Sequence, residues 1–202
     1  MKRIIFTILV TFALGGAANA TPGDAAQRAG QLDAAEKLYK RGAEQGDPVA
    51  AYKLARMRHT DADQKSIYWY KKSIELGKEN DYHSVMSAYY LGDIYTRDKD
   101  YKNAKYWYEK SASVGHHYSM YSLGGVYAES NSGAKEDVIG LMWINIVTKM
   151  ASTFENPNKG HLWVLNDKSG YKKMLKDRMN QKDIKKSDQL ADDWLSDFRN
   201  KK

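Results

Sequence analysis

Small and apolar residues recur at helical spacing in three segments of the chain, 49–59, 84–96 and 118–129. Apolar residues three or four positions apart lie on one face of an α-helix, whereas a half-buried strand alternates every second residue. The residues that form this pattern are Ala51, Leu54, Ala55, Ala88, Leu91, Gly92, Tyr95, Leu123, Gly124 and Tyr127. In each segment Leu is followed by Ala or Gly, and a small residue lets a neighbouring helix approach closely. The pattern predicts an all-α chain.

An aromatic segment is repeated along the chain. SIYWYKKS at 66–73 returns as AKYWYEKS at 104–111, after a weaker copy at 35–42 and before a partial one at 140–145. The copies begin 31, 38 and 36 residues apart. Repeats at this spacing are typical of arrays of helix pairs, in which one pair cannot bury its apolar face alone. Such arrays bind partners far more often than they catalyse reactions.

Glycine and proline mark the turns between these helices. Gly46 suits a left-handed residue after a helix, Asp47 can accept from the next amides, and Pro48 fits a first helical turn. Gly77 and Gly115 follow their own helices in the same way, so we predict the same conformation for them.

The first twenty residues resemble an export signal. Lys2 and Arg3 precede an apolar run at 4–14, and Ala-Asn-Ala at 18–20 matches a signal-peptidase site, so we predict cleavage after Ala20. The run is too short to span a bilayer, and no Cys is present for a lipid anchor or a disulfide. We predict a periplasmic protein, with secretion to the medium as the alternative.

The rest of the chain divides into three parts. Residues 21–150 hold the repeats, with an incomplete first helix at 24–30 as an N-terminal cap. Residues 151–170 form a long connection, and 171–202 hold two closing helices, the second capped by Asn180.

Charge excludes one class of partner. Without the leader the net charge falls from +7 to +5, and the positive residues are interleaved with Asp and Glu. This pattern is typical of a solvated helix surface, so we expect no nucleic-acid binding. We also expect no membrane span, because no second hydrophobic run follows the leader.

Two motifs, LGDIY at 91–95 and LGGVY at 123–127, together with the Trp-Tyr-x-Lys-Ser segments, resemble Sel1-like repeats, which are related to tetratricopeptide repeats. MWIN at 142–145 resembles the form that these repeats take near the end of an array, and the resemblance covers about residues 24–198. It implies a right-handed α-solenoid that binds proteins.

The resemblance also implies a choice of roles. Some exported members of the family are similar to immunity proteins that neutralise phospholipases or other toxic effectors, and we expect that role here. An envelope adaptor or regulatory scaffold is the alternative, and an exported hydrolase is the least supported. The oligomeric state stays open.

Catalytic and metal-binding residues have little support in the sequence, so we expect no enzyme activity, cofactor or metal. The histidines do not pair at a metal-binding helical spacing, and no Ser lies in a Gly-x-Ser-x-Gly motif. His116 and His117 are expected to be exposed in a turn. Trp69, Trp107 and Trp143 are expected to pack between repeats, and Trp107→Ala to empty the centre of the array.

The predicted partner site lies on the first helix of each unit, which in tetratricopeptide repeats faces the concave groove. The position two residues before the Leu is Tyr in three units. The predicted partner-binding residues are Tyr52, Arg56, Tyr89, Asp93, Tyr118 and Tyr121. Tyrosine is frequent in binding surfaces because it combines an apolar ring with a hydroxyl. We expect the tyrosines to contribute little to stability; alternatively, they cover gaps between helices.

The connection at 151–170 is a second candidate site. Phe154, His161 and Trp163 stand in an otherwise polar stretch, and long connections in compact domains are often functional. Alternatively, the apolar run at 162–165 covers the open end of the last repeat.

Overall fold

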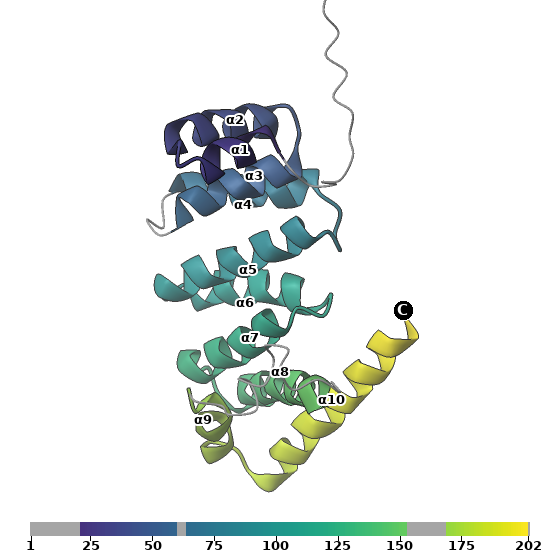
Figure 1. Ribbon diagram of the computed structural model, residues 1–202. Helices are drawn as coiled ribbons and strands as arrows, with labels where there is room; N and C mark the ends of the chain where they lie inside the picture. Colours follow the sequence, from purple (N-terminus) through teal and green to yellow (C-terminus); the bar gives the residue numbers. More distant parts are fainter. Residues whose placement is uncertain (1–20, 60–63, 153–168, 202) are drawn as a thin grey trace, which may run out of the picture.

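The computed structural model describes residues 21–59, 64–152 and 169–201. Ten α-helices and no strand lie in this part of the chain (Figure 1). In chain order the helices are α1 (Pro22–Arg28), α2 (Leu32–Glu44), α3 (Pro48–Met57), α4 (Gln64–Leu76), α5 (Tyr82–Arg97), α6 (Tyr101–Ala112), α7 (His117–Ser130), α8 (Ala134–Ser152), α9 (Tyr171–Asp177) and α10 (Gln181–Asn200). The predicted all-α class is confirmed.

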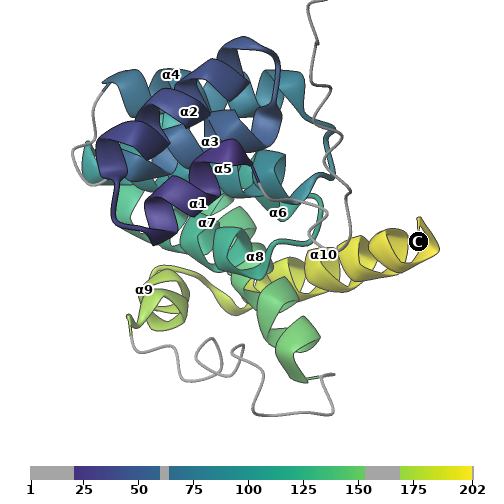
Figure 2. The same cartoon turned by 45° about the horizontal axis from the view of Figure 1, so that its top comes forward.

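The helices stack in pairs to form a solenoid (Figures 1 and 2). Each unit has a first helix (α1, α3, α5 or α7) and a second helix (α2, α4, α6 or α8) that packs on it. First helices also contact one another between units, α3 with α5 and α5 with α7, and α9 contacts α7 in the same way. This close approach places the first helices and α9 on the inner side of the stack.

Equivalent positions of the repeated aromatic segment are buried in each unit. The first residue of each aromatic segment is small and fully buried, as in Ala35 and Ala104. The fifth residue lies at the centre of its unit: Tyr39 and Tyr108 fill this place, and Ile144 takes it in the last unit. Each packs on a glycine of the first helix, because a Cβ added at Gly92 would lie 2.5 Å from the Tyr108 ring. The predicted close approach at the Leu-Gly positions is therefore confirmed.

Two of the three repeat tryptophans lie at the margin of this core. Trp69 and Trp107 are only half-buried, while Trp143 is buried. The expectation that Trp107 fills the centre of the array is wrong, because the neighbouring Tyr108 occupies that place. On an α-helix, adjacent residues point about 100° apart, so only one of the pair can face the first helix.

The turns follow the predicted chemistry with one exception. The Asp47 carboxylate accepts from the Val49 amide at 2.8 Å, and Gly46 and Gly115 have φ values of +91° and +98°. Gly77 does not adopt a positive φ, so the prediction for it is wrong. Its role is close approach, since a Cβ there would meet the Ser84 hydroxyl at 2.2 Å.

The last two helices, α9 and α10, both pack on α8 at the end of the array. Arg178 follows α9, and its guanidinium donates to both carboxylate oxygens of buried Asp137 on α8 and to the Ala128 carbonyl. α10 packs along α8, with the Trp194 ring 5.6 Å from that of Trp143. Within the described residues, no helix is long and apolar enough to cross a membrane.

Candidate protein-binding groove

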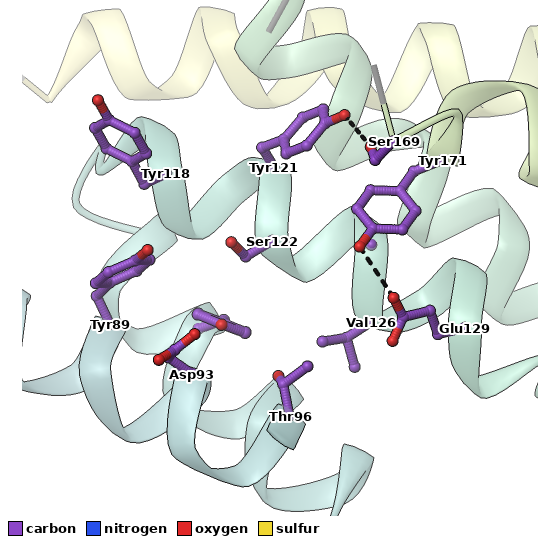
Figure 3. Close-up of a pocket in the computed structure, with 12 residues that line it drawn as sticks. Tyr89, Asp93, Thr96, Tyr118, Tyr121, Ser122, Val126, Glu129, Ser169 and Tyr171 are labelled. Atoms are coloured by element: carbon purple, nitrogen blue, oxygen red, sulfur yellow. Dashed lines mark hydrogen bonds between the residues drawn. The ribbon is translucent and has the colours of Figure 1, made fainter. Parts of the chain in front are cut away.

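The inner side of the solenoid holds a pocket between α5, α7 and α9, with a volume of about 440 Å³ (Figure 3). We call it the tyrosine pocket. It is lined by Tyr89, Asp93, Thr96, Tyr108, Tyr118, Tyr121, Ser122, Gly125, Val126, Glu129, Ser169 and Tyr171. Four of the six predicted partner-binding residues therefore lie together in it.

Helical spacing places the groups that line this pocket. Tyr89 and Asp93 are one turn apart on α5, and Tyr118 and Tyr121 lie on successive turns of α7. Gly125 leaves room for α9, because a Cβ there would lie 2.6 Å from the Tyr171 ring. The Leu-Gly-Gly sequence of this repeat thus admits both α8 and α9.

Two hydrogen bonds hold the chain around the start of α9 against α7. The Tyr171 hydroxyl donates to Glu129 Oε1 at 2.9 Å, and the Tyr121 hydroxyl bonds the Ser169 hydroxyl (Figure 3). The Tyr121 and Tyr171 rings are 5.7 Å apart. One wall of the pocket therefore comes from outside the repeats.

The remaining two predicted residues line a smaller pocket nearer the N-terminus. Tyr52 and Arg56 border it together with Gln27, Lys53 and Met57, and its volume is about 270 Å³. The Arg56 guanidinium lies 3.3 Å from the Tyr52 hydroxyl and donates to it.

Tyr90 connects the two pockets. Its ring is 6.2 Å from that of Tyr52 and 5.2 Å from that of Tyr89, and the Arg56 guanidinium lies 5.2 Å from its centre. Tyr89 continues the contact to Tyr118 at 6.3 Å. The inner side therefore carries an unbroken run of aromatic rings from α3 to α7.

The predicted tyrosines differ in burial. Tyr52 and Tyr121 are only 5% and 7% exposed, whereas Tyr118 is 43% exposed. The expectation that the tyrosines contribute little to stability is wrong for Tyr52 and Tyr121, because both belong to hydrophobic core clusters. For these two, the alternative that tyrosines fill the spaces between helices fits the structure.

Burial also raises the pKa of two tyrosines of this surface. It raises the pKa of Tyr89 to about 12, and it does the same for Tyr52 despite the hydrogen bond from Arg56. Like ordinary tyrosines these hydroxyls are neutral at neutral pH, and the shift extends their neutral range to higher pH, so they can donate as well as accept. Asp93 and Glu129 are the acidic groups of the tyrosine pocket.

His116 departs from the expectation of an exposed turn residue. It is half-buried beside Tyr89, with 5.2 Å between ring centres, and its Nδ1 accepts from the Ser119 amide. Burial, followed by the nearby His117 charge, lowers the pKa of His116 to about 4. It caps α7 in neutral form.

The described residues contain no group of three or more His, Cys, Asp or Glu side chains placed to hold a metal ion. The second candidate site, with Phe154, His161 and Trp163, lies outside the described residues. So does the predicted leader at 1–20.

Three residues of this surface escaped the sequence reasoning. Tyr90 directly follows a predicted residue, but its ring reaches back to Tyr52 and Tyr70 of the preceding unit, which helical periodicity does not indicate. Glu129 and Tyr171 meet only because α9 packs beside α7, and no repeat position marks that contact. The sequence of α9 does not match the repeat pattern. Its position as a fifth inner helix is therefore visible only from its contact with α7 in the structure.

Comparisons with known proteins add little to this picture. No protein-family model matches the chain, and no curated protein does. One similar solved structure is a protective antigen of uropathogenic Escherichia coli strains, described as displaying an SLR (Sel1-like repeat) fold. The two chains are 16% identical with a TM-score of 0.41, and the match covers 82% of this chain but only 41% of the antigen. At these values the likeness carries no argument about function.

Proposed function

We propose that this protein binds another protein in the groove formed by α3, α5, α7 and α9. The observation that carries the proposal is the unbroken run of aromatic rings along the inner helices, which ends in the tyrosine pocket. Tyr118 adds a ring to this run that is 43% exposed and so accessible to a partner. Solenoids commonly use their concave side for binding, and tyrosines are frequent anchors of such interfaces.

We further propose that the protein acts in the periplasm, after cleavage behind Ala20, as an immunity protein for a toxic effector such as a phospholipase. The support is the leader-like pattern at 1–20 and the resemblance to exported Sel1-like proteins. An envelope adaptor or scaffold would use the same groove, so binding and protection need separate tests.

Binding is tested by affinity capture from periplasmic extract and with the product of the neighbouring gene. The variant is Tyr118→Ser, and Tyr106→Ser is its control, because Tyr106 is similarly exposed at 53% but lies on the second helix α6. We expect Tyr118→Ser to weaken capture by at least about tenfold and Tyr106→Ser to leave it unchanged. Equal capture by two folded variants would place the binding site elsewhere.

Protection is tested by directing the neighbouring gene product to the periplasm with and without this protein. Immunity predicts that cells survive only when wild-type protein is present and that Tyr118→Ser protects less. Binding without any protection would instead support the adaptor role.

A further inference from the structure

We propose that the tyrosine pocket takes an arginine side chain of the protein bound in the groove. The inference rests on the proposed function in one respect: the arginine belongs to a protein that binds in the groove. Two features of the pocket point to a guanidinium group: its aromatic walls and its two carboxylates.

The walls suit a flat cation. Tyr89, Tyr118 and Tyr171 approach the pocket from three different helices, so rings border it on several sides (Figure 3). The face of an aromatic ring attracts a cation, and arginine is the most frequent protein cation at such sites. The Tyr89 hydroxyl can also accept from a guanidinium N–H.

The carboxylates stand at two separate points of the pocket. Asp93 belongs to α5 and Glu129 to the last turn of α7, where the Tyr171 hydroxyl orients it at 2.9 Å. No lysine, arginine or histidine stands among the described residues that line the pocket. The charged groups that a cation meets on the pocket wall are therefore these two carboxylates.

Asp93 has neighbours outside the pocket that must be counted. His59 Nε2 lies 3.2 Å and Arg97 Nε 3.8 Å from its Oδ2. The Asp93 side chain is still 39% exposed, so its carboxylate stays accessible from the pocket. The Arg97 contact holds the carboxylate in position on its own helix.

Arginine fits better than lysine for geometric reasons. Its guanidinium is planar, stacks on tyrosine rings and donates through several N–H groups, whereas the lysine ammonium is a compact and strongly hydrated charge. With carboxylates on two helices, a group with several directed donors can reach both acceptors or bind one of them bidentately. The pocket volume of about 440 Å³ also leaves room for residues beside the arginine.

The test uses the tripeptide acetyl-Gly-Arg-Gly-amide as the probe, titrated into the full exported chain and followed by amide NMR. Its citrulline analogue has the same shape without the charge, and its lysine analogue keeps the charge without the plane. We expect the arginine peptide to shift the signals of Gly125 and Tyr171, and the two analogues to bind at least about fivefold more weakly.

Variants of the two carboxylates test whether the arginine peptide binds in the tyrosine pocket. Asp93→Asn and Glu129→Gln should each weaken binding of the arginine peptide by about threefold or more, while Asp197→Asn on exposed α10, with the same change of charge, should not. Equal binding of the citrulline peptide, or indifference to both pocket variants, would overturn the inference. Equal binding of the lysine peptide would overturn the choice of arginine.

The peptide titration and the capture experiment can fail independently of each other. If Tyr118→Ser loses the captured partner while the arginine peptide does not bind, this inference fails and the groove remains the binding site. If the peptide binds as expected while Tyr118→Ser keeps its partner, the pocket accepts arginine and the proposed protein-binding groove fails.

Discussion

Tyr52, Tyr89 and Tyr121 occupy the same position in three successive units, yet their surroundings differ. Tyr89 is half-buried at the edge of the tyrosine pocket, while the other two lie in the core. The sequence predicted the face on which these rings lie, because helical periodicity determines it. It did not predict their burial, because that depends on neighbours from other units and from α9, such as Tyr171 beside Tyr121.

The aromatic pair on α6 gives a direct test of which ring forms the core. Tyr108 is fully buried against Gly92, so Tyr108→Ala should lower the free energy of unfolding by about 3–5 kcal/mol. Trp107 is half-buried, so Trp107→Ala should cost roughly half as much. Urea unfolding of both variants provides the comparison, and a larger loss at Trp107 would contradict this account of the core.

His116 should make stability depend on pH. The unfolded chain takes up a proton near the ordinary pKa of 6.5, whereas folded His116 does so only near pH 4. The unfolded state therefore binds more protons between these values, and the free energy of unfolding falls as the pH is lowered through them. We expect His116 to account for a loss of about 2–3 kcal/mol across the window.

The matched variant is His116→Asn, which keeps an oxygen that can cap α7. Urea unfolding of wild type and variant near pH 7.5 and near pH 4.5 separates the contribution of His116 from those of other groups. Between these two pH values the free energy of unfolding should fall by about 2–3 kcal/mol less in the variant than in wild type. An unchanged difference between the two pH values would show that His116 is not the group responsible.

At the scale of helices, caps and small residues explain why so much of the fold could be predicted. The Asn180 side chain accepts from the Asp183 amide at 2.9 Å, as expected, and the helices begin and end near the predicted residues. The sequence does not tell whether a glycine after a helix supplies a positive φ or lets another helix approach closely. Gly77 was assigned a left-handed turn, but its role is to let Ser84 approach, which depends on a contact between helices.

Gly92 sets the distance between α5 and α6. A Cβ there would lie 2.5 Å from Tyr108, so Gly92→Ala should cost about 1–3 kcal/mol by overpacking, although alanine favours helices by about 1 kcal/mol. Tyr108→Leu removes the ring, and adding Gly92→Ala to it should then cost little. A double-mutant cycle in urea measures this coupling. Additive losses would mean that another contact sets the spacing.

At the scale of the whole molecule, α10 closes the stack. It packs along α8 and buries Ala191 and Leu195 in the same cluster as Trp143. Without it, the apolar outer side of α8 would face water at the end of the array, and terminal units of solenoids need a polar outer face for solubility.

Leu195→Asp should detach α10, because it places a charge in that cluster. We expect a loss of about 3 kcal/mol or more in the free energy of unfolding and self-association through the exposed side of α8. Light scattering after size exclusion detects the association. Ser196→Asp is the control, since that neighbouring residue is exposed. A monomeric and equally stable Leu195→Asp variant would show that α10 is not needed as a cap.

The order of contacts along the stack has a consequence for how the chain acquires its structure. Helices from α1 to α8 pack mainly on the helices beside them in the sequence, so each unit can form as soon as its own residues are free to fold. A chain that emerges with its N-terminus first, from a ribosome or a translocation channel, can therefore build the array one unit at a time. The α8 surface must wait for α10, which comes after all the other helices. In that interval the nearly finished protein offers chaperones and proteases an apolar surface that the mature fold conceals.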